Sequence, residues 1–252
     1  MLYLIVGLLA GMLGAMTGLG GGIIMVPVMT ILFGVPIHKA VGISIFAIVV
    51  NSSIAAVSYT KKGYVDIKLG LALEQSTIIG AIIGALVSGL IDEKKLAFIM
   101  GVVLIFASFQ MVSPLKRLIA EEDIKVRNLT PLYKIRNISI GIVLSVVAGC
   151  AAGMLGVGGG IFKIPIMYLI MDVPIKVAVG TSSFMIMLTS VASGWIFFLR
   201  GDIYIEIALF MAGGVALGSF IGSKVGIKLR GKWQTRIVAL VLLMAAIKML
   251  LS

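Results

Sequence analysis

Apolar and polar positions alternate along this chain on the scale of whole helices. Long apolar runs are separated by short polar breaks, and they lie approximately at 2–17, 22–37, 40–60, 69–91, 96–113, 138–155, 161–175, 177–199, 203–223 and 233–251. Such runs are typical of transmembrane helices, which need about 20 apolar residues to cross the hydrocarbon core. Alternating polar and apolar stretches of about ten residues, the pattern of membrane β-barrels, are absent. We therefore predict an all-α polytopic membrane protein, and the 60% hydrophobic composition agrees with this fold class.

The longest polar stretch divides the chain near its middle. It reads "SPLKRLIAEEDIKVRNLTPLYKIRN" and covers residues 113–137, between a first transmembrane half at 1–112 and a second at 138–252. When the sequence is shifted by 138 residues, Met16–Phe46 falls on Met154–Phe184 without a gap, and 16 of 31 positions are identical. The identities include glycines and prolines. In an aliphatic sequence, chance matches of Leu, Ile and Val are frequent, but chance matches of glycine and proline are not. The two halves are therefore predicted to be repeats.

The distribution of basic residues indicates how the repeats are oriented. Lys and Arg gather in the cytoplasmic loops of membrane proteins, so we attribute the net charge of +11 to membrane orientation rather than to nucleic-acid binding. If each half crosses the membrane an even number of times, 11 basic residues lie on the side of the linker and 9 on the other. An odd number gives 15 against 5, with Lys163 left out of both counts. The positive-inside rule therefore predicts inverted repeats and a cytoplasmic linker at 113–137.

Two glycine-rich stretches interrupt the apolar runs at equivalent positions. They read "TGLGGGIIMVPVM" at Thr17–Met29 and "LGVGGGIFKIPIM" at Leu155–Met167. Each glycine weakens a helix interior by roughly 1 kcal/mol relative to alanine, and segments 2–17 and 22–37 are both short for a membrane span. We therefore expect each half to contain a glycine-broken re-entrant helix pair followed by three full transmembrane helices. A second arrangement, in which both short segments are tilted and span, has the same parity and remains open.

The glycine loops are candidate anion-binding sites. Each loop ends where a helix begins, and there the first backbone N–H groups have no internal partner while the helix dipole adds partial positive charge. Inverted repeats would bring two such ends together near the middle of the membrane, where secondary transporters bind their substrates. The alternative is that the glycines only allow close helix packing. The candidate substrate-binding glycines are Gly18, Gly20, Gly21, Gly22, Gly156, Gly158, Gly159 and Gly160.

The same residues carry a family resemblance. The stretches "GLGGGIIMVPVM" and "GVGGGIFKIPIM", each followed by "VPI" and then "AVG", resemble the duplicated motif of the sulfite exporter TauE/SafE family. The resemblance covers nearly the whole chain. It implies a multi-pass protein of a bacterial or archaeal inner (cytoplasmic) membrane that exports sulfite or small organosulfonates. Those substrates are anions, which agrees with the separate argument from the helix ends.

Polar residues in the next apolar segment of each half form a second set of candidates. Ser44 and Asn51 are seven residues apart, as are Ser182 and Thr189, so each pair lies on one helix face. Their hydroxyl and amide groups could complete the coordination of an oxyanion. The alternative is that they form hydrogen bonds between helices.

Two ionisable residues lie inside apolar segments. Lys163 is three residues past Gly160, and its equivalent in the first half is Met25. A charge within the membrane is a candidate for function, so we expect Lys163 to contribute to substrate binding; the alternative is that it snorkels to an interface. Glu74 is a candidate proton carrier, although Lys68 is close enough in sequence for Glu74 to lie at an interface instead.

Small residues recur four apart in "GAIIGALVSG" at Gly80–Gly89 and "GSFIGSKVG" at Gly218–Gly226. This spacing is typical of helices that cross closely. We interpret these two stretches as packing surfaces rather than as binding sites.

Several function classes are excluded or disfavoured by what the sequence contains. Cys150 is the only cysteine, which excludes an internal disulfide and a multi-cysteine metal site, and neither an H-E-x-x-H motif nor a nucleophile paired with a base is present. We therefore expect that the protein is not an enzyme and that it has no catalytic residues, metal or cofactor. The sequence favours a secondary transporter that exports a small anion by alternating access, with proton coupling as an option. The rivals are a passive anion channel and a membrane-embedded scaffold, and a homo-oligomer is neither required nor excluded.

Overall fold

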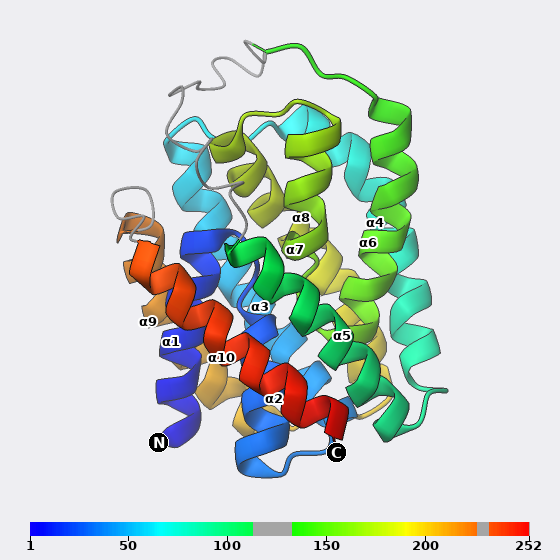
Figure 1. The fold of residues 1–252 in the computed structure, drawn as a ribbon, viewed down its shortest axis with the longest axis vertical. Helices are drawn as coiled ribbons and strands as arrows, with labels where there is room; N and C mark the ends of the chain where they lie inside the picture. Colours follow the sequence, from blue (N-terminus) through cyan, green and yellow to red (C-terminus); the bar gives the residue numbers. More distant parts are fainter. Residues whose placement is uncertain (113–132, 226–231, 252) are drawn as a thin grey trace.

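The computed structural model describes residues 1–112, 133–225 and 232–251, and every regular element in these ranges is helical (Figure 1). The all-α prediction is confirmed. The elements in chain order are α1 Leu2–Thr17, α2 Gly22–Phe33, α3 Ile37–Lys61, α4 Ile67–Ser88, α5 Glu93–Val112, α6 Ile138–Leu155, α7 Gly160–Pro165, the π-helical segment η2 Ile166–Ile170, α8 Ile175–Leu199, α9 Ile205–Val225 and α10 Lys232–Leu251. Among them, α3, α4, α6, α8 and α9 are long and apolar enough to cross a membrane.

The starts of the long helices follow from local sequence. Both α3 and α8 begin after a proline, Pro36 and Pro174, whose φ angles of −51° and −54° are paired with extended ψ angles that end the preceding segment. Helix α4 begins at Asp66, whose Oδ1 accepts a hydrogen bond of 3.0 Å from the N–H of Leu69. The repeated "VPI" of the sequence therefore sets the same helix start in both halves.

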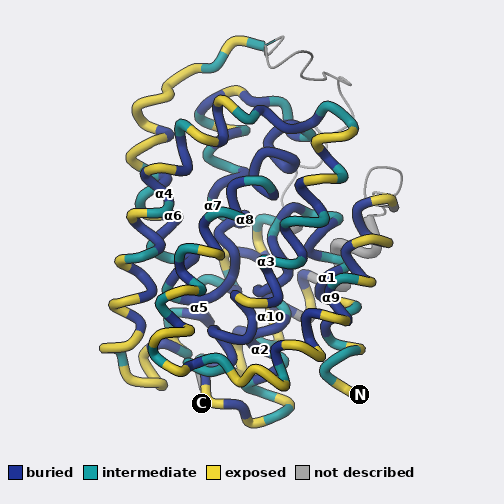
Figure 2. Tube along the Cα trace, turned by 180° about the vertical axis from the view of Figure 1, so that it is seen from behind, coloured by how far each residue is buried: buried dark blue, intermediate teal, exposed yellow. Residues whose placement is uncertain are grey.

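Helices from the two halves pack against each other in reciprocal pairs. The long helices α3 and α8 pack together, α1 packs on α9, α6 packs on α4, and α5 packs on α10. Under the 138-residue shift α1 corresponds to α6 and α4 to α9, so the first two outer contacts are equivalent, with the halves exchanged. Figure 2 shows the buried part of the trace in the centre of the molecule and the exposed part on the outer helices and at the two ends.

Close helix crossings form where the sequence repeats small residues. A Cβ atom on Gly80 or Gly84 of α4 would meet backbone carbonyls of α6 at less than 3.0 Å, closer than real Cβ atoms come. Gly218 and Gly222 of α9 meet backbone carbonyls of α1 in the same way. The packing interpretation of these glycines is confirmed, and both crossings join one half of the molecule to the other.

The glycine-broken segments turn back on themselves in both halves. In Figure 1, α1 runs from the N-terminus toward the middle of the molecule and α2 returns to the same end, while α6 and α7 do the same from the opposite end. This path is the one expected of a re-entrant pair. The orientation of the halves relative to a bilayer stays a prediction. So does the cytoplasmic position of the linker, of which 113–132 lies outside the described residues.

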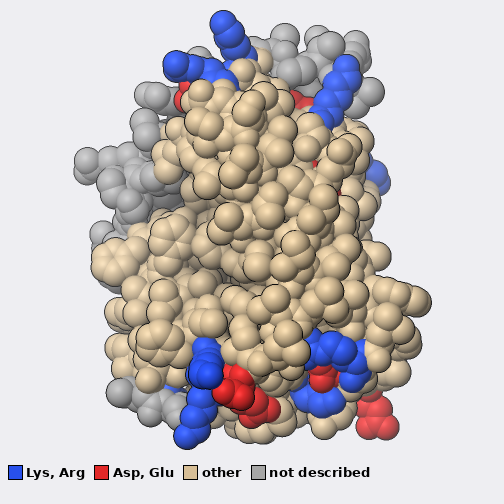
Figure 3. All heavy atoms as spheres, turned by 90° about the vertical axis from the view of Figure 1, so that its right-hand side faces the viewer, with Lys and Arg blue, Asp and Glu red and all other residues tan. Residues whose placement is uncertain are grey.

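The surface has the distribution of charge that a membrane protein requires. On the face seen in Figure 3, the Lys, Arg, Asp and Glu side chains gather toward the two ends of the molecule, with a largely uncharged surface between them. Large apolar side chains are exposed on the outer helices, such as Ile79 on α4 at 58% and Phe210 on α9 at 58%. In water so many exposed apolar side chains would be costly, whereas acyl chains solvate them well.

Candidate functional site

The glycine loops adopt backbone angles that favour glycine. The first loop has φ of 73° at Gly18, 90° at Gly20 and 80° at Gly21. In the second loop the equivalent glycines, Gly156, Gly158 and Gly159, have φ of 65°, 81° and 74°. Side chains with a Cβ are strained at these angles. The predicted breaks between α1 and α2, and between α6 and α7, are therefore confirmed.

The two loops lie directly against each other at the junction of the two halves. A Cβ on Gly20 would lie 3.5 Å from the Cα of Gly158. A Cβ on Gly22 would meet the carbonyl of Gly156 at less than 3.0 Å, and a Cβ on Gly160 would meet that of Gly18 equally closely. Packing of loop on loop therefore requires glycine at 22 and 160, whatever else the loops do.

Backbone donors collect where the loops meet. The N–H groups of Gly18 and Gly156 donate to carbonyls four residues earlier, which caps α1 and α6. The N–H groups at 20–22 and 158–160 find no backbone or side-chain acceptor within the described residues. Helices α2 and α7 begin at these positions. The centre of the molecule thus holds two sets of unpaired donors at helix N-termini, where the helix dipole is positive.

Ser44 and Ser182 hold the loops in place. The Ser44 hydroxyl on α3 donates to the carbonyl of Gly156 at 2.9 Å, and the Ser182 hydroxyl on α8 donates to that of Gly18 at 3.3 Å. Each serine therefore ties the long central helix of one half to the glycine loop of the other. A hydroxyl has a single proton, so in this conformation neither serine has one left for a ligand.

Asn51 lies beside the first glycine loop. Its Oδ1 accepts a hydrogen bond from Ser219 on α9, and its Nδ2 would lie 3.5 Å from a Cβ on Gly21. The amide oxygen of Asn51 therefore forms the hydrogen bond between helices that was one of the two predictions, and the amide nitrogen lies close to the glycine loop.

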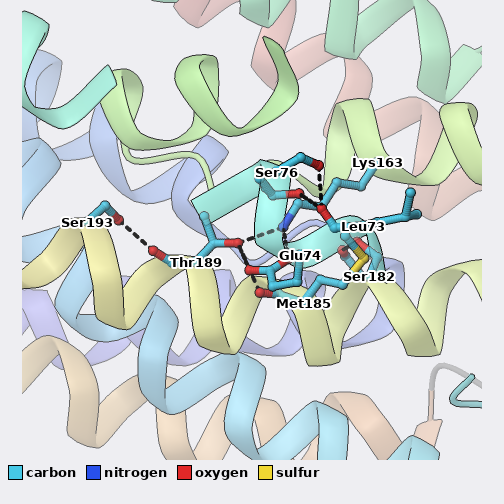
Figure 4. Close-up of polar contacts among 10 residues, drawn as sticks. Leu73, Glu74, Ser76, Lys163, Ser182, Met185, Thr189 and Ser193 are labelled. Atoms are coloured by element: carbon cyan, nitrogen blue, oxygen red, sulfur yellow. Dashed lines mark hydrogen bonds and ion pairs between the residues drawn. The ribbon is translucent and has the colours of Figure 1, made fainter. Parts of the chain in front are cut away.

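Lys163, Glu74 and Thr189 come together in the interior (Figure 4). The ammonium Nζ of Lys163, on α7, lies 3.2 Å from Glu74 Oε2, on α4, and donates to Thr189 Oγ1, on α8, at 2.7 Å. The Thr189 hydroxyl in turn donates to Glu74 Oε1. Lys163 and Glu74 are each 1% exposed. Neither side chain therefore reaches the surface of the described part of the protein, which disfavours snorkelling of Lys163.

This charged cluster joins the two halves, and the equivalent position related by the repeat lacks its charges. The 138-residue shift places Met25 at the position of Lys163, Ala212 at that of Glu74 and Asn51 at that of Thr189. The sequence marks Lys163 and Glu74 separately as charges in apolar segments, but they are 89 residues apart and nothing in their spacing predicts the pair. The pairing depends on α4 of the first half packing beside α8 of the second.

A polar cluster at one end of the molecule also escaped the sequence analysis. The Arg200 guanidinium, at the end of α8, lies 2.7 Å from Asp202 Oδ2 and donates to the Ala85 carbonyl of α4 at 2.7 Å. Lys39 on α3 lies 3.4 Å from Asp202 Oδ1. This cluster joins helices of both halves.

A second polar cluster joins the two halves where α4 begins. The Tyr133 hydroxyl donates to Asp66 Oδ2 at 2.8 Å, and both burial and the Asp66 carboxylate raise the pKa of Tyr133. Thr181 Oγ1 on α8 accepts from the Asp66 N–H at 2.9 Å. Within the described residues, no group of three or more His, Cys, Asp or Glu side chains could hold a metal ion.

Comparison with known proteins gives a single family. A family model described as "Sulfite exporter TauE/SafE" matches residues 3–249. The chain is 30% identical to "Probable membrane transporter protein YunE" of Bacillus subtilis, over 96% of this chain and 92% of that protein. It is 28% identical to a "Probable membrane transporter protein" of Haemophilus influenzae, over 100% of this chain and 98% of that protein. No solved structure matches the chain significantly.

Proposed function

Because the chain belongs to the sulfite exporter TauE/SafE family and is a membrane transporter, we propose that it exports a small anion, sulfite or an organosulfonate. Transport follows alternating access between two inverted repeats, in the inner (cytoplasmic) membrane of a prokaryote. The names of the family and of the relatives indicate a membrane transporter rather than an enzyme, and in this proposal the site binds its substrate without changing it.

This proposal rests on the backbone N–H groups without acceptors where the two glycine loops meet. An oxyanion presents several acceptor oxygens, and backbone N–H groups at a helix N-terminus are suited to receive them. Two such ends from opposite halves, which are in contact in this structure, can together bind one small oxyanion when the loops move apart. The N–H groups of Gly20–Gly22 and Gly158–Gly160 are the proposed contacts, with Lys163 beside the second loop.

The reciprocal packing of the halves supports alternating access. The α1–α9 and α4–α6 crossings are equivalent contacts between the halves, built from glycines against backbone carbonyls. Smooth surfaces of this kind let helices slide with little side-chain rearrangement. Sliding at both crossings would open the loop junction first to one side of the membrane and then to the other. Proton coupling belongs to the same proposal, with Glu74 as the carrier.

Ligand-dependent thermal stability tests the proposed substrate class. Detergent-purified protein is heated with sulfite, sulfate, thiosulfate, taurine, sulfoacetate and carboxylates at matched ionic strength, with chloride as the control. A ligand present at 100 times its Kd stabilises the folded protein by about 2.7 kcal/mol, so a sulfur oxyanion or sulfonate is expected to raise the unfolding temperature above that in chloride. Stabilisation by none of the anions, together with copurification of a partner protein, would support a scaffold and overturn the proposal.

A further inference from the structure

The proposed function gives Lys163 and Glu74 separate roles, and the ion pair between them indicates how the two roles are linked. We propose that the Glu74 carboxylate is an internal substitute for the substrate. When no anion is bound, the carboxylate pairs with the ammonium of Lys163. When the anionic group of the substrate binds to that ammonium, Glu74 takes up a proton and the ion pair is broken. This inference rests on the proposed function and adds to it a stoichiometry of one proton for each singly charged anion.

The argument begins with charge balance in the protein interior. The ammonium of Lys163 is 1% exposed, and an unpaired charge at such a site is strongly unfavourable. Within the described residues Glu74 is its salt-bridge partner, at 3.2 Å. The elements around Glu74 are α6, α7 and α8, and beyond Lys163 their only charged side chain is Lys176, in the first turn of α8. Their other ionisable groups are the thiol of Cys150 on α6 and, next to α7, the phenol of Tyr168. Lys163 therefore needs one negative charge, and Glu74 now supplies it.

A sulfonate or hydrogen sulfite can replace that carboxylate on chemical grounds. Each carries one negative charge spread over oxygens that accept hydrogen bonds from an ammonium. If such an anion joined the site while Glu74 stayed ionised, the interior would hold an unbalanced negative charge. When a proton adds to a carboxylate oxygen of Glu74 and forms an O–H bond, the site remains neutral. The substrate and the proton must therefore enter together.

Thr189 is placed to transmit the exchange. Its hydroxyl accepts a hydrogen bond from Lys163 at 2.7 Å, and its single proton has two acceptors within reach, Glu74 Oε1 and the Met185 carbonyl at 3.0 Å. Once Glu74 is a neutral acid, it becomes a donor, and the Thr189 proton can turn from Glu74 to an oxygen of the substrate or to the Met185 carbonyl. Lys163 also has three N–H donors, of which two are used in the hydrogen bonds to Glu74 and Thr189. The third is available to the anion.

The position of Lys163 joins this exchange to the glycine loops. Its Cε would lie 3.5 Å from a Cβ on Gly159, so the side chain runs along the second loop and its unpaired N–H groups. The first loop has Met25 and Ala212 at the equivalent positions, which carry no charge. Among the residues that the structure describes there is therefore one exchange site of this kind, and one proton moves with one monoanion.

Proton uptake by the wild-type protein tests the proposal without any substitution. Methanesulfonate is a suitable probe because its charge is fixed at minus one, and sulfite is measured in parallel. Calorimetric titrations in buffers of different ionisation enthalpy give the number of protons taken up for each methanesulfonate bound. We expect one proton. Binding of methanesulfonate without proton uptake would overturn the exchange and the proton coupling while leaving anion transport by alternating access intact.

Substitutions test the same exchange in proteoliposomes whose outside is more acidic than the inside, so that protons moving inward can drive the anion inward. Wild type is expected to accumulate methanesulfonate or sulfite against its concentration gradient, and Glu74→Gln to exchange the anion without accumulating it. Lys163→Met, the residue found at the equivalent position 25, is expected to weaken binding at least tenfold. Asp92→Asn removes the carboxylate of an exposed ion pair, Asp92–Lys95, and serves as the matched control with wild-type accumulation. Accumulation by Glu74→Gln equal to that of wild type would overturn the inference.

The stability of Glu74→Gln provides a readout if that variant folds poorly. Its Lys163 lacks a counter-ion, so added methanesulfonate should restore monodisperse protein and raise its unfolding temperature more than it does for wild type. An equal or smaller effect of methanesulfonate on Glu74→Gln would contradict the exchange. If wild-type protein neither binds nor transports any of the anions, the proposed function itself fails, which is a different result from loss of proton coupling alone.

Discussion

At the scale of single residues, the buried ion pair of Lys163 and Glu74 should respond differently to loss of one partner and to loss of both. Loss of one partner should destabilise the fold strongly, whereas loss of both should change the free energy of unfolding little. Removing one partner leaves a buried charge without a counter-ion, which typically costs about 3–5 kcal/mol, whereas replacing both partners with apolar residues is often neutral. The chain contains its own example of the neutral arrangement. Met25 and Ala212 occupy the positions equivalent to Lys163 and Glu74 and are buried without any charge.

This asymmetry predicts the stability of three variants. Glu74→Ala and Lys163→Met should each lower the unfolding temperature by an amount that corresponds to about 3–5 kcal/mol, because each strands the opposite charge. The double variant, which reproduces the equivalent pair Met25 and Ala212, should be more stable than either single variant. Thermal unfolding of the three purified proteins measures this coupling. Additive losses in the double variant would mean that the two side chains do not interact as described.

Sequence reasoning at this scale found the residues but not their partners. Lys163 and Glu74 stand out because a charge in an apolar segment is rare, and Ser44 and Ser182 stand out because they repeat in register. The partner of each is fixed by contacts between segments far apart in the chain, such as Ser44 with the Gly156 carbonyl. Spacing within one helix carries no information about such contacts.

At the scale of elements, glycine has two separate uses in this protein. In the loops at 18–22 and 156–160 it supports left-handed backbone angles. In α4 and α9 it has ordinary helical angles and lets another helix approach. Both uses were predictable, because the first places glycines in consecutive positions next to a helix start and the second places them four apart. The π-helical segment after Pro165 was not predicted, since apolar residues on all sides leave no periodicity to follow.

A matched set of alanine substitutions separates packing glycines from free ones. Gly84→Ala and Gly218→Ala should reduce the yield of monodisperse protein, because each new Cβ would press on a backbone carbonyl of the neighbouring helix. Gly213→Ala on α9 meets no atom within 4 Å and should be neutral or should stabilise by up to about 1 kcal/mol. Size-exclusion profiles and unfolding temperatures provide the comparison. Equal behaviour of all three variants would contradict the close crossings.

At the scale of the whole molecule, the reciprocal contacts extend the repeat from sequence to packing. Shifting by 138 residues maps the contact of Ser44 with Gly156 onto that of Ser182 with Gly18. The duplication was recognisable from glycine and proline identities. How the halves face each other was not, because loop charges indicate sides of a membrane but not contacts within it.

The inverted orientation predicts where two loops lie. Residues near Glu121–Lys125 in the linker and near Arg230–Lys232 should both face the cytoplasm, because only an odd number of crossings in each half gives the 15 to 5 distribution of basic residues. Single cysteines introduced at these places in a Cys150→Ala background can be labelled with a membrane-impermeant reagent from either face. Labelling of the two loops from opposite faces would exclude inversion.

The most direct test of a transporter that binds one small anion between two halves is counterflow. Proteoliposomes containing the purified protein are loaded with unlabelled sulfite under anaerobic conditions, and entry of radiolabelled sulfite is followed against protein-free liposomes. A carrier predicts entry that saturates with external sulfite and that is accelerated by sulfite inside, because each return of a loaded site exposes it again. Entry that rises linearly with concentration and ignores the internal anion would contradict alternating access, and entry equal to that of protein-free liposomes would contradict sulfite transport.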